Sequence, residues 1–342
     1  MTAQGMFLVA RLEFRTRLRT GRWKILLGVW FLVVALFSLG LRGVLSSAIT
    51  EESEDGVAMF GTLLFFVLLL MLLIAPSLTA QSINGDRERG TLAQLQMTLL
   101  TPLEIASGKL LAAWSTGLAV LALALPFIAW PILEGDVDPL RGLVCLLVTA
   151  LLIGVVCAVS QALSALVVRS VTSALLSYLT VFGMLFGTLI TFGLATTLVT
   201  DTERRVGPDY SYTEDQVHTE RIWWILAPNP FVVLSDAAPR LPRKRVCWEE
   251  EMPGPMEGRC YYTSPTAFDP LGETGQAVRA ARVGPQRSGE DNDAYELRKE
   301  HAAAVWPFGL AVQFGLAAGA LAITARRLRT PADRLPKGVR IA

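Results

Sequence analysis

The chain has 342 residues, of which 52% are hydrophobic and only 18% are charged. A soluble globular domain usually carries about 25% charged residues, so this composition excludes an ordinary soluble protein. The formal net charge is only +1, so the overall charge gives no electrostatic reason to expect nucleic-acid binding.

The apolar residues are concentrated in runs of about 20, the length that a helix needs to cross a bilayer core roughly 30 Å thick. A helix also satisfies its own backbone hydrogen bonds in lipid. We therefore predict an all-α polytopic membrane protein. Its six expected transmembrane helices cover residues 25–45, 57–78, 110–133, 140–168, 171–199 and 302–325.

Residues 1–24 precede the first span and are too charged to cross a membrane. Phe7, Leu8, Leu12, Phe14 and Leu18 alternate there with arginines at helical spacing. This pattern predicts an amphipathic helix in the membrane interface, with its basic side toward anionic lipid head groups. An unstructured basic flank is the simpler alternative. The segment lacks a small-residue cleavage site after a short apolar core, so we expect the first span to be an uncleaved signal anchor.

The charges that flank the spans are distributed asymmetrically. Basic residues gather before the first span and after the last, at Arg11, Arg15, Arg17, Arg19, Arg22, Lys24, Arg326, Arg327, Arg329, Arg334, Lys337 and Arg340. Acidic residues dominate the short connections on the other face, at Glu51, Glu52, Glu54, Asp55, Glu134, Asp136 and Asp138. The positive-inside rule therefore predicts that both termini lie in the cytoplasm, residues 326–342 being a basic tail. We expect the membrane to be the plasma membrane.

A compact charged stretch separates the second span from the third. The sequence predicts a cytoplasmic helix at residues 84–100, between the spans of the transmembrane unit that covers residues 25–199. Thr101-Pro102, followed by Glu104, predicts the start of the next helix. The candidate site residues are Arg87, Glu88, Arg89, Gly90 and Thr91. Such a helix can contact a partner protein through its charges, with Gly90 permitting close approach and Thr91 capping or turning the chain. A solvated loop is the alternative reading.

Residues 200–301 form the one large polar region, which this topology places outside the cell. We expect loops with short helices there, one of them near residues 271–282. Residues 222–233 are apolar but too short to span, and Pro228 and Pro230 argue against a continuous helix, so this stretch is expected to be interfacial or re-entrant. Cys247 and Cys260 could pair in an oxidising compartment or remain as two free thiols.

The motifs of common enzymes are missing from the sequence. It has no phosphate-binding Gly-x-x-x-x-Gly-Lys-Ser/Thr, no His-Glu-x-x-His and no Gly-x-Ser-x-Gly. We therefore expect no catalytic, cofactor-binding or metal-binding residues. Ion-coupled carriers keep ionisable groups at mid-membrane, and these span interiors hold almost none. Their Ser, Thr and aromatic side chains suit an apolar or amphipathic cargo, and suit a plain helix bundle equally well.

Three stretches together resemble a known family. Glu88-Arg89-Gly90-Thr91-Leu92, Thr101-Pro102-Leu103-Glu104 and Gly108-Lys109-Leu110 resemble the signature of ABC-2 type ABC transporter permeases. Ala227-Pro228-Asn229-Pro230-Phe231 resembles a Ser/Asn-Pro-Phe stretch that these permeases often carry after span five. The 200–301 region is longer than in many simple members, and we expect the ATP-binding domain to be supplied by a separate chain.

The resemblance implies an exporter subunit that is not itself an enzyme. The stretch at 84–100 would be the coupling helix, which docks in a cleft of the ATP-binding subunit. The partners would be two ATP-binding subunits and a second permease chain, identical or different, within membrane lipid. A different function also fits the sequence, namely a non-transporting membrane scaffold or sensor whose external region binds a ligand.

Overall fold

A computed structural model describes residues 3–18, 21–47, 52–96, 98, 100–206, 211–241, 244–247, 260–263, 269–287 and 289–329. The described residues contain six helices long and apolar enough to cross a membrane, as the sequence predicts. They are α2 (Gly21–Ser47), α3 (Glu52–Thr79), α6 (Pro102–Glu134), α7 (Pro139–Leu166), the interrupted helix α8 (Ser170–Phe182) to α9 (Thr188–Thr196), and α13 (Trp306–Leu328).

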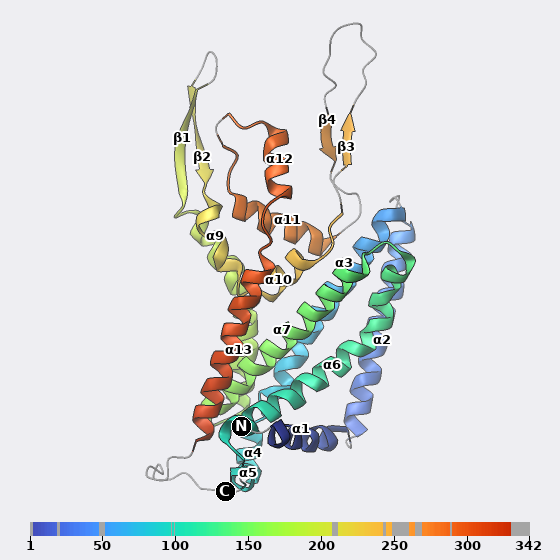
Figure 1. Cartoon of the computed structure of the whole chain (residues 1–342), viewed down its shortest axis with the longest axis vertical. Coiled ribbons are helices and arrows are strands. Elements are labelled where there is room, and N and C mark those ends of the chain that lie inside the picture. The colour runs from blue at the N-terminus through green and yellow to red at the C-terminus, as the bar shows by residue number, and fades with distance from the viewer. Residues whose placement is uncertain are drawn as a thin grey trace.

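These helices form one elongated bundle with different structures at its two ends (Figure 1). One end carries α1 (Ala3–Leu18), α4 (Asn84–Glu88) and α5 (Thr91–Gln96), and α13 finishes there; we call it the α4 end. The opposite end carries two β-hairpins, and we call it the hairpin end. The start of α1 and the end of α13 therefore lie at the same end of the bundle, as an even number of spans requires.

The centre of the bundle is α3. Its Phe60, Leu64 and Leu68 have no exposed surface and pack with residues of α6 and α7. By contrast, α2 lies at the periphery and exposes Ile25 and Leu39, as an apolar helix facing lipid would. At the hairpin end, Arg42 of α2 forms a salt bridge with Glu134 of α6, with nitrogen and oxygen 3.2 Å apart.

Local signals explain where α6 begins and ends. The Thr101 side chain accepts a hydrogen bond from Glu104 N, and the Glu104 carboxylate accepts one from Thr101 N, which together make the capping box that starts the helix. Pro102 occupies the first turn, where its missing N–H costs nothing. At the other end Gly135 has φ of 93°, a left-handed conformation that stops the helix.

The 200–301 region contains more ordered structure than the sequence suggested. Helix α11 (Pro270–Val283) lies where a short helix was expected, and α12 (Asn292–Glu300) follows it. Two antiparallel hairpins were not expected: β1 (Thr200–Val206) pairs with β2 (Ser211–Val217), and β3 (Lys244–Cys247) pairs with β4 (Cys260–Thr263). Both hairpins project away from the bundle (Figure 1).

The apolar stretch 222–233 is divided between two short elements. A 3-10 turn covers Trp223–Leu226, and α10 (Pro230–Ala237) follows it with Asn229 as its N-cap. Val233 and Leu234 of α10 are fully buried and belong to the same apolar core as α3. This segment therefore packs into the hairpin end of the bundle, and its place relative to the membrane, interfacial or re-entrant, stays a prediction. The last span is shorter than expected, because its helix starts at Trp306 and not at residue 302.

Candidate functional site

The charged stretch between the second and third spans is not one helix, as the sequence predicted, but two. Gly90 has φ of 73° and separates α4 from α5. Only glycine adopts this left-handed conformation freely. Gly90 therefore ends α4 and separates it from the apolar Leu92 and Leu95 of α5. We call residues 84–96 the α4–α5 segment. Met97 and Leu99, which were expected to extend the helix, lie outside the described residues.

The structure brings the five candidate residues onto one short turn. Arg89 donates to Asp86 Oδ1 over 3.0 Å and keeps 66% of its side chain exposed. Arg87 donates over 3.4 Å to Asn84 Oδ1 of the same helix, and the Thr91 hydroxyl donates over 3.3 Å to the Asp86 carbonyl. These bonds fix the shape of the turn while leaving the Arg89 guanidinium accessible.

Glu88 connects the turn to another span. Its exposed carboxylate accepts a hydrogen bond from the hydroxyl of Ser170, the first residue of α8. Ser173, one turn further along α8, donates to the carbonyl of Ala80 over 2.8 Å. The start of span five is therefore tied both to the α4–α5 segment and to the end of span two.

The backbone of the segment is tied to span four as well. The Ser164 hydroxyl, at the end of α7, accepts hydrogen bonds from Ile83 N over 3.2 Å and from Asn84 N over 3.1 Å. These N–H groups lie at the N-terminus of α4, where a helix has no internal acceptor for them. One turn earlier in α7, Gln161 donates to the Ala106 carbonyl of α6 over 2.8 Å.

Lys109 is the buried centre of this end of the molecule. Only 1% of its side chain is exposed, and its ammonium is bonded to the carboxylates of Asp86 and, over 3.0 Å, of Glu13. An unpaired buried ammonium would be strongly unfavourable, so the two carboxylates make its burial tolerable. The three residues come from α6, α4 and α1, so one ion cluster joins span three, the α4–α5 segment and the N-terminal helix.

Helix α1 is held against α6 by close packing next to this cluster. A Cβ on Gly108 would lie 2.7 Å from Val9 Cβ and 2.8 Å from the Met6 carbonyl oxygen, so only glycine permits this approach. The opposite face of α1 leaves Phe7 and Leu8 exposed. In Figure 1 the helix lies across the bundle axis. The predicted helix is therefore present, and its place in the membrane interface stays a prediction.

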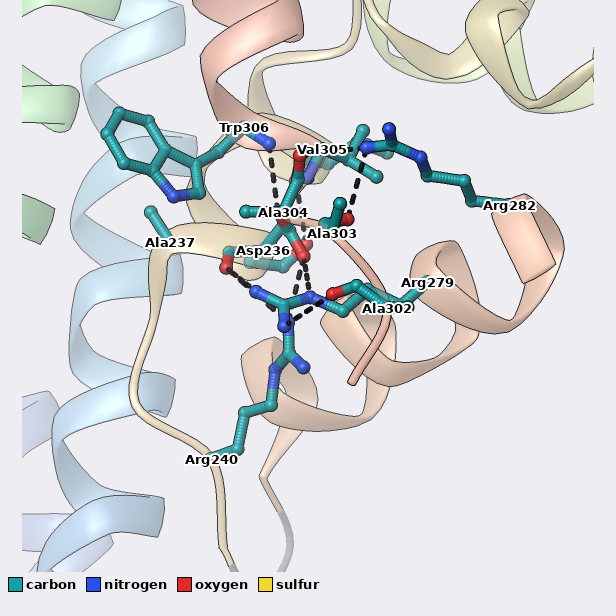
Figure 2. A network of polar contacts seen from close by, with 12 residues as sticks. Asp236, Ala237, Arg240, Arg279, Arg282, Ala302, Ala303, Ala304, Val305 and Trp306 are labelled. Carbon is teal, nitrogen blue, oxygen red and sulfur yellow. Dashed lines mark hydrogen bonds and ion pairs between the residues drawn. The ribbon is translucent and has the colours of Figure 1, made fainter. Parts of the chain in front are cut away.

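A second polar centre lies at the hairpin end, around Asp236 of α10 (Figure 2). Its side chain is fully buried and accepts four hydrogen bonds. Oδ1 accepts from Arg279 over 2.6 Å and from Arg240 over 2.8 Å. Oδ2 accepts from the backbone N–H groups of Val305 over 2.5 Å and Trp306 over 2.8 Å. This carboxylate therefore fastens the start of α13 to α10 and α11.

The two candidate disulfide cysteines face each other in the backbone pairing of one hairpin. Cys247 ends β3, Cys260 begins β4, and the two are Cα partners in the antiparallel register. Directly opposed residues of an antiparallel pair have Cα atoms about 4.5–5.5 Å apart, within the range that a disulfide spans. The side chains of both cysteines lie outside the described part of the structure, so the bond stays a prediction. Cys145 and Cys157 are buried and belong to no disulfide.

The sequence analysis placed Lys109 in a stretch that resembles the family signature and Asp86 in the predicted helix at 84–100, but it predicted no ion pair for them and no role for Glu13 or Asp236. A signal existed for Lys109, because it is the only cation in the run that becomes α6. Asp236 has one local partner, Arg240 four residues on, but Arg279 and Val305 lie 43 and 69 residues further along the chain, so the sequence does not mark Asp236 as a polar centre. Its burial follows from the tertiary fold alone.

Comparison with known proteins agrees with this architecture. The family model described as "ABC-2 family transporter protein" matches residues 28–322. This range includes most of the first and last spans, all of the other four, the α4–α5 segment and the 200–301 region. A search of curated proteins finds no match to the chain.

Proposed function

Because the chain belongs to the ABC-2 family of transporter proteins, we propose that it is the permease subunit of an ATP-driven exporter. ATP would be hydrolysed by two separate ATP-binding subunits, and a second permease chain would complete the membrane domain. The cargo is unidentified; the apolar spans with interior Ser and Thr would suit an apolar or amphipathic molecule.

The single observation that supports this function best is the attachment of the α4–α5 segment. Lys109 links it to span three and α1, Ser164 links it to span four, and Glu88 links it to span five. A partner that pulled or tilted this turn would therefore move several spans together. Arg87, Glu88, Arg89, Gly90 and Thr91 are the residues that we assign to contact with the ATP-binding subunit.

We also propose that the α4 end faces the cytoplasm, with the chain in the plasma membrane. Arg11, Arg15, Arg326 and Arg327 all belong to elements at that end. Basic residues close to the ends of spans favour the cytoplasmic side. The 200–301 region would then be extracytoplasmic, because long loops translocate largely regardless of their charge.

Co-purification with an ATPase tests the proposal most directly. The tagged full-length chain would be isolated in mild detergent from its own host, and ATP hydrolysis would be measured in the eluate. We expect an ATP-binding protein in stoichiometric amount, with hydrolysis that changes when the complex is reconstituted in lipid. A chain that purifies without any ATPase, yet remains folded, would contradict the proposal and favour the scaffold or sensor.

A further inference from the structure

Span five is interrupted by a π-helical turn between α8 and α9. Residues Gly183–Gly187 form this turn, and Thr188 N donates to the Gly183 carbonyl, five residues back. A π-turn of this kind accommodates one extra residue inside an α-helix and occurs frequently at functional sites. Each residue beyond the turn therefore occupies the angular position that its predecessor would have in an uninterrupted α-helix.

Side chains bond to the carbonyl groups of this turn. The Thr188 hydroxyl donates to the Met184 carbonyl over 2.9 Å. The Asn229 side-chain amide donates to the Leu185 carbonyl over 2.8 Å and to the Thr188 hydroxyl oxygen over 3.0 Å. Asn229 is almost completely buried. Away from water an amide donor needs a partner, so its hydrogen bonds favour the backbone shape that presents these acceptors.

The turn that carries Asn229 is itself held by other spans. Gln313 of α13 donates to the Pro228 carbonyl over 2.6 Å. The Phe231 ring stacks on Phe65 of α3, with ring centroids 4.4 Å apart. Asn229 Oδ1 meanwhile accepts from Phe231 N over 2.9 Å and caps α10. Asn229 thus bonds the π-turn of span five to a turn whose neighbouring residues, Pro228 and Phe231, contact spans six and two.

The register beyond the π-turn decides which face of α9 meets the rest of the hairpin end. Phe192 packs against an apolar cluster that includes Leu226, Val232 and Val278, whereas Leu194 is 67% exposed. If the π-turn became regular α-helix, α9 would turn by one residue, about 100°. Thr191 and Leu194 would then take the inward positions now held by Phe192 and Ala195, and Phe192 would leave the cluster.

We propose that Asn229 is a positioning residue that stabilises the π-turn and so holds α9 in its present rotation, the π register. We also propose that during transport the π-turn becomes regular α-helix, which turns α9 into the α register. The second part of this proposal rests on the proposed exporter function, whereas the first does not. Release would separate the outer half of span five from Leu226 and Val232. The bundle would thereby open at the hairpin end.

The register can be measured in the isolated full-length chain. Spin labels would be placed one at a time along Thr188–Thr196 in a background whose four cysteines are replaced by serine, and oxygen accessibility would be recorded in bilayers. With Asn229 present, the accessibility minima are expected at Phe192 and Ala195. Asn229→Asp keeps the acceptor that caps α10 but loses the donor, and should move the minima to Thr191 and Leu194.

Deletion of Gly187 supplies the matched control. The deletion removes the extra residue of the π-turn, so α8 and α9 form a continuous α-helix in which α9 keeps its present face. Asn229→Asp, made in this deletion background, should then leave the accessibility profile unchanged. If Asn229→Asp alone does not accumulate in the membrane, recovery of accumulation by the Gly187 deletion would support the proposal, and no recovery would overturn it. An unshifted profile in Asn229→Asp would also overturn it.

The transport step needs the complex with its ATPase. Adding ATP and vanadate should move the minima by one residue in the chain with Asn229 and should leave them fixed in the chain lacking Gly187. An unchanged profile in a complex that hydrolyses ATP would refute release during transport. A chain without an ATPase would refute the exporter function and would leave the register result standing.

Discussion

At the scale of single residues, Lys109 is the shared cation of Glu13 and Asp86 and joins α6 to α1 and α4. Replacing Lys109 by methionine leaves the carboxylates of Glu13 and Asp86 close together without their shared cation. Removing one partner of a buried ion cluster costs roughly 3–5 kcal/mol. We therefore expect Lys109→Met to lower the unfolding temperature in detergent, measured by thermal denaturation, and a wild-type value would contradict this role.

A triple variant separates stability from coupling. Glu13→Gln, Asp86→Asn and Lys109→Met together remove the whole cluster, and replacing complete buried ion groups is often close to neutral for stability. We expect this variant to regain most of the lost thermal stability. The link between α1, α4 and α6 would still be weakened, so its partner ATPase should respond less to reconstitution in lipid.

Asp269 provides a prediction about pH. It caps α11 by accepting from Gly272 N over 3.0 Å, but burial raises the pKa of its carboxyl to about 6. The nearby Glu273 carboxylate also raises this pKa, whereas backbone hydrogen bonds from Gly272 and Leu271 oppose the rise. The folded state thus binds the proton more tightly than the unfolded chain, whose carboxyl has a pKa near 3.8.

The sign of the effect follows from this difference. The stabilising contribution of the protonated Asp269 is complete below about pH 4 and is lost as pH rises through about 6. The difference between a folded pKa of about 6 and an unfolded pKa near 3.8 corresponds to a loss of about 3 kcal/mol. The unfolding temperature of wild type, relative to that of Asp269→Asn, should therefore fall between pH 4 and pH 7. A difference that stays constant or grows with pH would contradict the raised pKa.

At the scale of elements, the exposed turn of the α4–α5 segment is where the ATPase contact can be tested. Reversing Glu88 to lysine or Arg89 to glutamate changes an exposed charge, which usually alters stability by less than about 0.5 kcal/mol. In a contact with a partner, an unpaired desolvated charge costs roughly 2–5 kcal/mol, which weakens binding by more than tenfold. We expect folded chains that lose their ATPase during purification.

Arg42→Glu is the matched control for these reversals. It also reverses an exposed, salt-bridged side chain, but at the hairpin end of the bundle. Retention of the ATPase by Arg42→Glu and its loss from Glu88→Lys and Arg89→Glu would support the assignment. Full retention in all three variants would exclude residues 87–91 as the contact.

The hairpin formed by β3 and β4 yields a prediction about covalent structure. Because Cys247 and Cys260 are opposed in its register, we expect them to form a disulfide when the 200–301 region is outside the cell. Non-reducing mass spectrometry should recover their two peptides as one linked species. Complete labelling of both cysteines by a thiol reagent without prior reduction would contradict the bond.

The sequence predicted some of these elements better than others, for physical reasons. The six spans are visible because bilayer thickness dictates a long apolar run for each. The break at Gly90 was not predicted, because an isolated glycine can be tolerated inside a helix, and only its φ of 73° reveals that the helix ends there. The β1–β2 hairpin was missed because charged residues in Thr200–Val206 obscure the alternation that marks a strand.

At the scale of the whole molecule, two polar centres lie at opposite ends of an apolar bundle. The cluster at Lys109 joins elements of the α4 end, and the carboxylate of Asp236 joins elements of the hairpin end. Helices α6, α7 and α13 run between these ends as packed rods. A displacement of the helices at one polar centre is therefore expected to move them at the other centre, as the proposed exporter requires.

The orientation of the molecule in the membrane gives the last prediction. Arg11, Arg15, Arg326 and Arg327 belong to the α4 end, and moving such charges across a bilayer is opposed, so this end should remain in the cytoplasm. A reporter fused after residue 342 should be active only inside the cell, and one inserted near Gly254 only outside. Activity of both reporters on one side would refute six spans. If the reporter after residue 342 were active outside and the one near Gly254 inside, the orientation would be the reverse of that proposed. Residues 87–91 would then lie outside the cell, where a cytoplasmic ATPase cannot contact them.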